Sequence, residues 1–139
     1  RQHPEHEVYV GRRKARYQRM SETAFNTLKE IPSILINRTN GAFYMSVLFR
    51  EDVLTQRQTL PIENHQIRAL IESLLQSNGN ISLDKRFVYY LLAATGVCVV
   101  PLSSFNTDLQ GFRFTLLDPD EDSFFRMVNT LAEGVKAYV

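Results

Sequence analysis

Two hydrophobic periodicities follow one another along the chain, and their order restricts the folds that it can adopt. From about residue 4 to residue 30, apolar side chains recur at helical spacing, and Pro32 then ends the helix. Short extended segments follow at 34–37 and 42–49, and the turn residues 39–41 join them. A long helix that leads directly into two strands predicts a fold in which helices and strands pack on one another.

The remainder of the chain adds further elements of both kinds. The expected elements are, in order, helices at 67–75 and 83–94, strands at 97–100 and 111–117, and a last helix after residue 120. The helices are expected to end at Asn78-Gly79-Asn80 and at Gly96, and Asp120 is expected to cap the last one. The order predicts the α+β class: a two-layer sandwich whose small sheet of about four strands is covered by helices.

Two segments are expected to be fully buried. Both faces of 42–49 are largely apolar, which is typical of a central strand covered on both sides. Cys98 lies in the apolar run 97–100 and is expected to be an inert buried thiol. As the only cysteine it excludes an intrachain disulfide, and this fits a reducing compartment, so we expect a cytoplasmic protein.

Size and charge limit the functions open to the chain. Its 139 residues predict a single domain, 1–139, that can bury a core. A net charge of +1 gives no reason to expect a nucleic-acid partner. The longest apolar stretch, 87–102, is interrupted by Gly96 and Pro101 and is too short to span a membrane. The chain begins at Arg1 rather than Met, so we expect a piece of a longer protein.

Two groups of residues could bind metal, and each has a simpler interpretation. Asp118, Asp120 and Asp122 alternate as calcium ligands do, but the glycine and the closing glutamate of a calcium loop are missing. We interpret them as the cap and first turn of a helix. His3 and His6 have no further cysteine or histidine nearby, so no metal site is expected.

A run of basic residues crosses the first helix between residues 12 and 19. A nucleic-acid surface would need aromatic side chains interleaved with these charges or a second basic face, and the sequence indicates neither. We therefore interpret the run as a solvated or domain-facing helix surface.

Arg113 lies in the middle of the strand at 111–117. Strand alternation places Phe112 and Phe114 on one face and Arg113 on the other. Three interpretations stay open at this point: a solvated charge, half of an ion pair, or a guanidinium that binds an anion. The sequence contains no glycine-rich phosphate loop and no recognisable nucleophile with its base, so no catalytic residue is expected.

Five short motifs, in this order, resemble those of a known family. They are Tyr17 with Leu28-x-x-Ile31-Pro32, then Gly41-Ala42-Phe43-Tyr44, then Leu91 to Pro101, then Ser103-Ser104-Phe105, and lastly Gly111-Phe112-Arg113-Phe114. Over essentially its whole length the chain resembles the C-terminal minor domain of the class I/II, fold-type I, pyridoxal-phosphate-dependent aminotransferases, of the aspartate/alanine aminotransferase kind.

The resemblance implies a role for Arg113. In that family the arginine of this strand binds the α-carboxylate of the amino-acid or 2-oxo-acid substrate, and a planar guanidinium can hold a carboxylate through two hydrogen bonds. The chain would then be the small domain of a longer, homodimeric enzyme that exchanges an amino group between these substrates.

The resemblance also implies what this chain lacks. The lysine that binds pyridoxal 5'-phosphate and the residues around its phosphate belong to the catalytic large domain of that family. None of the four lysines here stands in a matching context, so we expect cofactor only in the parent enzyme and no activity from this chain alone. Two alternatives remain: a pyridoxal-phosphate-dependent lyase of the same fold, and a stand-alone α+β ligand-binding or regulatory module.

Overall fold

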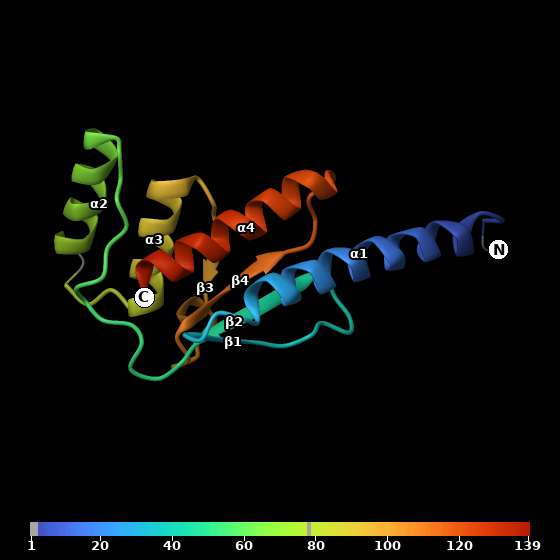
Figure 1. Cartoon of the computed structure of the whole chain (residues 1–139), viewed down its shortest axis with the longest axis horizontal. Coiled ribbons are helices and arrows are strands. Elements are labelled where there is room, and N and C mark those ends of the chain that lie inside the picture. The colour runs from blue at the N-terminus through green and yellow to red at the C-terminus, as the bar shows by residue number, and fades with distance from the viewer. Residues whose placement is uncertain (1–2, 78) are drawn as a thin grey trace.

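The structure, a computed structural model, describes residues 3–77 and 79–139 (Figure 1). Its elements are α1 (His6–Leu28), β1 (Ile34–Ile36), β2 (Tyr44–Phe49), α2 (His65–Ser77), α3 (Leu83–Thr95), β3 (Val100–Pro101), the 3-10 helix η1 (Leu102–Phe105), β4 (Gly111–Thr115) and α4 (Glu121–Tyr138). Asn78, in the predicted turn after α2, lies outside the described residues. Gly96 ends α3 as predicted, in the left-handed conformation with φ of 77°.

The four strands form one antiparallel sheet in the order β1-β2-β4-β3. The predicted α+β class is therefore confirmed. The strand that carries Arg113 is an inner strand, with Ser46 of β2 opposite Arg113 on one side and Val100 of β3 opposite it on the other. Pairing on both sides fixes the register of Arg113.

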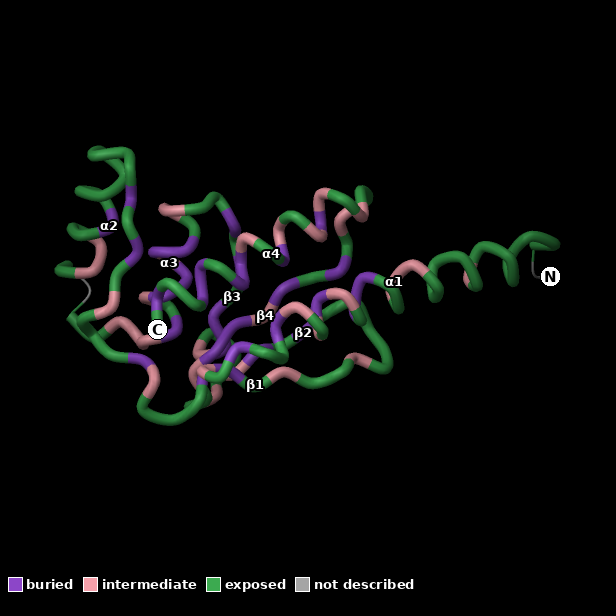
Figure 2. The backbone as a smooth tube through the Cα atoms, in the orientation of Figure 1, coloured by how far each residue is buried: buried purple, intermediate pink, exposed green. Residues whose placement is uncertain are grey.

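The hydrophobic core lies between one face of this sheet and the helices α1, α3 and α4 (Figure 2). Its largest fully buried side chains are Phe87, Phe112, Phe124 and Met20, which come from α3, β4, α4 and α1. The rings of Phe87 and Phe112 lie 5.5 Å apart, so α3 packs directly on the centre of β4. The alternation predicted for β4 is confirmed, because Phe112 and Phe114 are buried and Arg113 is not.

The opposite face of the sheet is open. In β2, Met45 and Val47 are buried but Tyr44 is 40% exposed, and Leu35 and Val100 on the neighbouring strands are exposed as well. The expectation that 42–49 is covered on both faces is therefore wrong. Its apolar residues on the second face are surface residues of this chain, because the helices pack on the first face only.

Cys98 is exposed, so the prediction of a buried thiol is wrong. Within 97–100, Val97 and Val99 are buried while Cys98 and Val100 are exposed. The strand β3 is short and lies at the edge of the sheet. Alternate side chains of this apolar run therefore face away from the core, which a run of apolar letters does not reveal.

The two ends of the molecule are formed by α1 and α2. The N-terminal half of α1 projects beyond the sheet, and α2 stands at the opposite end of the molecule beside α3 (Figure 1). In α2, Ile67 and Leu70 are exposed and Ile71 is buried. Among the described residues no helix is both long and apolar enough to cross a membrane.

Candidate functional site

Arg113 lies near the centre of the open sheet face. Its side chain is half-buried, and it contacts two aromatic rings from different elements. The guanidinium carbon Cζ lies 4.5 Å from the ring centroid of Tyr44 on β2 and 3.9 Å from that of Phe105 at the end of η1. The ring of Tyr44 is itself supported by Phe43, at 4.5 Å between centroids.

Stacking of this kind uses the flat face of the guanidinium and leaves its N–H groups in the plane. Across residues 3–77 and 79–139, Arg113 forms no ion pair and donates no hydrogen bond to a protein acceptor. Of the three interpretations of Arg113, the ion pair is therefore excluded within the described part of the chain. Two rings contact the guanidinium, and the binding of an anion by its N–H groups stays a prediction.

A buried carboxylate lies close to this site, and its burial was not predicted from the sequence. Asp84, in the first turn of α3, is 0% exposed. It accepts hydrogen bonds from the backbone N–H and the side-chain Oγ–H of Ser103, at 2.9 and 2.7 Å, and from the backbone N–H of Gly111 at 3.4 Å. From sequence, an acidic residue in a first turn indicates an exposed helix terminus, so its burial could not be read.

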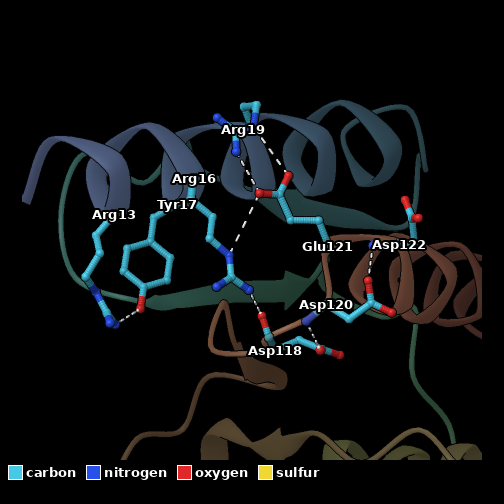
Figure 3. Close-up of polar contacts among 8 residues, drawn as sticks. All are labelled: Arg13, Arg16, Tyr17, Arg19, Asp118, Asp120, Glu121 and Asp122. Carbon is cyan, nitrogen blue, oxygen red and sulfur yellow. Dashed lines mark hydrogen bonds and ion pairs between the residues drawn. The ribbon is translucent and has the colours of Figure 1, made fainter. Parts of the chain in front are cut away.

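The acidic residues 118–122 cap α4 and hold it to α1 (Figure 3). Asp120 accepts a hydrogen bond from the backbone N–H of Asp122 at 3.1 Å, which confirms the predicted N-cap. Glu121 accepts a hydrogen bond from Arg19 at 2.7 Å. No group of three potential metal ligands lies together in the part of the chain that the structure describes.

The basic run in α1 is divided between two environments. Arg16 donates a hydrogen bond to the backbone carbonyl of Asp118, and its Nε lies 3.8 Å from a carboxylate oxygen of Glu121 (Figure 3). At Arg16 the run therefore contacts the start of α4 in the same chain, and the interpretation of a solvated or domain-facing surface stays a prediction for the rest of the run. The statement that aromatic side chains are not interleaved is wrong, since Arg13 donates hydrogen bonds to the hydroxyls of Tyr9 and Tyr17 one turn to either side.

The four lysines do not fit a covalent cofactor site. They are Lys14, Lys29, Lys85 and Lys136, and all are exposed. Lys29 and Lys136 form ion pairs with Glu30 and Glu133 on their own helical segments. A lysine that binds a carbonyl cofactor needs an enclosed site that lowers its proton affinity, and none of these positions supplies one.

The chain is similar to known proteins in sequence and in fold. No protein-family model matches the chain. It is 41% identical, over 137 residues and 99% of its length, to an uncharacterized aminotransferase of Methanocaldococcus jannaschii. The match covers 31% of that relative, so the chain is similar to about a third of the relative's length.

A structural comparison agrees. The chain superposes on a crystal structure of an aminotransferase from Escherichia coli with a TM-score of 0.59 and 18% sequence identity. The match covers 88% of this chain and 24% of the other, and at this identity it shows a shared fold. The resemblance to aminotransferases that the five motifs predicted is confirmed, and the assignment to a C-terminal domain stays a prediction.

Proposed function

We propose that residues 1–139 are the C-terminal small domain of a pyridoxal-phosphate-dependent aminotransferase, and that Arg113 binds the carboxylate of its substrates. The substrates are an amino acid and a 2-oxo acid, which share an α-carboxylate. The observation that carries the proposal is the guanidinium of Arg113, fixed by two aromatic rings and free of protein acceptors among the described residues.

The chemistry of the site favours a carboxylate. Arginine stays protonated at any physiological pH, and its planar N–H fork matches the two oxygens of a carboxylate. The rings of Tyr44 and Phe105 fix the guanidinium before the ligand arrives, so less side-chain entropy is lost on binding. Held at this end, a substrate has its α-carbon at a defined distance from the sheet, which is how positioning contributes to rate.

The open sheet face fits a second domain that covers it. Leu35, Tyr44 and Val100 are exposed apolar side chains around Arg113. In the proposed enzyme the large domain closes over this face, and the exclusion of water strengthens the contact between Arg113 and its ligand. The two polypeptides of a homodimer would complete the enzyme.

Cofactor and catalytic lysine are assigned to the remainder of the polypeptide, because the four exposed lysines of this domain do not fit that role. Pyridoxal 5'-phosphate acts as an electron sink when it is bound to an aminotransferase. This domain alone is therefore proposed to bind no cofactor and to be inactive. Its contribution is to bind and orient the substrate.

Steady-state kinetics of the full-length polypeptide test the proposal. Arg113→Ala should raise KM for amino-acid substrates about 10- to 100-fold, the loss of a charge-assisted bidentate contact, while absorbance of the bound cofactor persists. Arg113→Lys should recover only part of the loss, because lysine keeps the charge without the fork. The matched control is Arg38→Ala, since Arg38 also stacks on a ring, that of Phe25 at 4.8 Å, but lies elsewhere.

An unchanged KM in Arg113→Ala would mean that Arg113 has a structural role and does not bind the substrate.

The coding sequence upstream provides a separate test of the domain assignment. If it encodes no domain with an enclosed lysine, the aminotransferase proposal fails and a stand-alone module is the better interpretation. Product analysis of the full-length polypeptide separates amino-group transfer from lyase chemistry.

A further inference from the structure

Asp84 is a buried charged group that the proposed function does not yet use. It lies in the first turn of α3, 29 positions before Arg113 in the chain, and its side chain is fully buried. A buried carboxylate is costly unless hydrogen bonds replace its water. One donor that replaces water is the backbone N–H of the neighbouring Lys85, at 2.7 Å from Oδ1. The other donors belong to the loop that carries one wall of the Arg113 site.

The two oxygens of Asp84 accept hydrogen bonds from both ends of that loop. Ser103 donates its N–H to Oδ2 at 2.9 Å and its Oγ–H to Oδ1 at 2.7 Å, and Gly111 donates its N–H to Oδ2 at 3.4 Å. The backbone N–H of Asp84 donates in turn to Gln110 Oε1 at 3.1 Å. One side chain thus closes the base of the loop between residues 103 and 111.

Asp84 binds the loop at Ser103 and at Gly111, and each of these lies two residues before one partner of the Phe105–Arg113 contact. Phe105 follows Ser103 in η1, and Arg113 follows Gly111 in β4. The Phe105 ring contacts Arg113 but is 43% exposed and does not belong to the hydrophobic core. Core packing therefore does little to hold this ring, and its position depends on the loop.

We propose that Asp84 is a positioning residue that holds the loop 103–111 so that Phe105 stacks on Arg113. The inference rests on the proposed function for its consequence, because the stacked arginine is the group assigned to the substrate carboxylate. Asp84 itself is too deeply buried to contact a substrate. It acts on binding through the loop and leaves the chemistry of the reaction to other residues.

Proton NMR of the 139-residue chain tests the positioning directly. The ring current of Phe105, at 3.9 Å, should shift the side-chain resonances of Arg113 upfield, and Phe105→Leu defines the unshifted positions. Asp84→Asn removes the charge and replaces one acceptor oxygen by an NH₂ group, which then faces a backbone N–H donor: those of Ser103 and Gly111 at the Oδ2 position, or that of Lys85 at the Oδ1 position. In this variant we expect the Arg113 resonances to move at least halfway toward those of Phe105→Leu.

The control is Asp108→Asn, the same substitution at an exposed position of the same loop, which should leave the Arg113 resonances in place. Core resonances of Phe114 and Phe124 report whether the fold is kept. If they are kept and the Arg113 resonances of Asp84→Asn coincide with the parent's, the proposal is wrong. A role in stability alone would give that result.

If Asp84→Asn does not fold, Ser103→Ala tests whether the hydrogen bonds to Asp84 position the loop. It removes one of the hydrogen bonds to Asp84 and should move the Arg113 resonances in the same direction by a smaller amount. Unmoved resonances in a folded Ser103→Ala chain would overturn the proposal.

A titration with acetate and with pyruvate separates this inference from the proposed function. Loss of the Phe105 contact should raise the dissociation constants of Asp84→Asn about two- to fivefold, the worth of one cation–π contact. If Arg113→Ala leaves carboxylate binding unchanged, the proposed function fails, while the NMR result still decides whether Asp84 holds the loop.

Discussion

The guanidinium groups of Arg16 and Arg113 are held in opposite ways, although both come from regular elements and both contact distant parts of the chain. Arg16 on α1 donates to the carbonyl of Asp118 and lies beside the carboxylate of Glu121. Arg113 on β4 has two aromatic rings and no protein acceptor among the described residues. Arg16 uses a hydrogen bond and an ion pair to hold α1 against the start of α4, whereas the N–H groups of Arg113 have no protein acceptor in the described part of the chain.

The position of Arg113 depends on the pairing of β4 with β2. Of the substitutions considered, Gly111→Ala should lower the free energy of unfolding most. A Cβ at Gly111 would lie 2.1 Å from the carbonyl oxygen of Val47 and 2.9 Å from Leu102, so the strands must separate. We expect the free energy of unfolding to fall by about 3 kcal/mol. Urea denaturation measures this loss.

The matched control is Gly11→Ala, in the exposed part of α1, where nothing lies within 4 Å of an added Cβ. This change should instead stabilise the chain by about 0.5 to 1 kcal/mol, because alanine is the better helix former. Equal effects at the two glycines would contradict the close contact between β4 and β2.

The second prediction concerns Arg16 and Arg113 themselves. Arg16→Ala should lower the free energy of unfolding by about 1 kcal/mol, because it leaves the carbonyl of Asp118 without its donor. Arg113→Ala should change it by less than about 0.5 kcal/mol, and Arg12→Ala on the exposed side of α1 serves as the control. If Arg113→Ala were the more destabilising change, Arg113 would be structural.

The third prediction concerns the rings of Tyr44 and Phe105, which contact Arg113. Tyr44→Leu keeps apolar bulk beside Arg113 but removes one π face at 4.5 Å. The dissociation constant for a small carboxylate should rise about two- to fivefold, and the free energy of unfolding should change little. Acetate titration followed by NMR measures the first quantity. An unaltered affinity would mean that Phe105 alone holds the guanidinium.

The smallest effect concerns pH. The hydrogen bond from Arg19, aided by the charges of Arg19 and Arg16, lowers the pKa of Glu121 below its ordinary value of 4.5, although desolvation opposes the shift. Since the folded-state pKa is the lower one, the stabilisation is present above pH 4.5 and is lost as the pH falls through that folded-state value. Glu121→Gln should therefore be slightly less stable than the parent at neutral pH.

The difference between Glu121→Gln and the parent should shrink as the pH falls below 4.5 and as salt is added, because the pair lies at the surface. Thermal unfolding midpoints across this pH range provide the measurement. A difference that stays constant with pH would assign the effect of the substitution to something other than the carboxylate charge.

Periodicity predicted much of this fold. The helix after residue 120 and the alternation of Phe112, Arg113 and Phe114 were predicted from the sequence, and both are confirmed. Periodicity failed at the sheet face that no described element covers. The exposed side chains of Tyr44 and Cys98 belong to apolar segments that the sequence indicates as buried, and no local pattern shows that one sheet face is open.

The candidate site was predictable only in part. The resemblance singled out Arg113, but neither ring partner was expected, because Tyr44 and Phe105 approach Arg113 from segments far away in sequence. Asp84 was missed because its burial depends on a loop that begins 19 residues later. Contacts between distant segments are set by tertiary packing, which residue spacing does not encode.

The edge strands of the sheet are short, and this limits self-association through the sheet edges. An exposed strand edge with apolar neighbours is a template onto which another molecule can add a strand and aggregate. Here the edge strands β1 and β3 have three and two residues, and they offer few unpaired amides. The inner strands β2 and β4 carry Tyr44 and Arg113, so the face around them can stay apolar and open with little risk of edge-to-edge association.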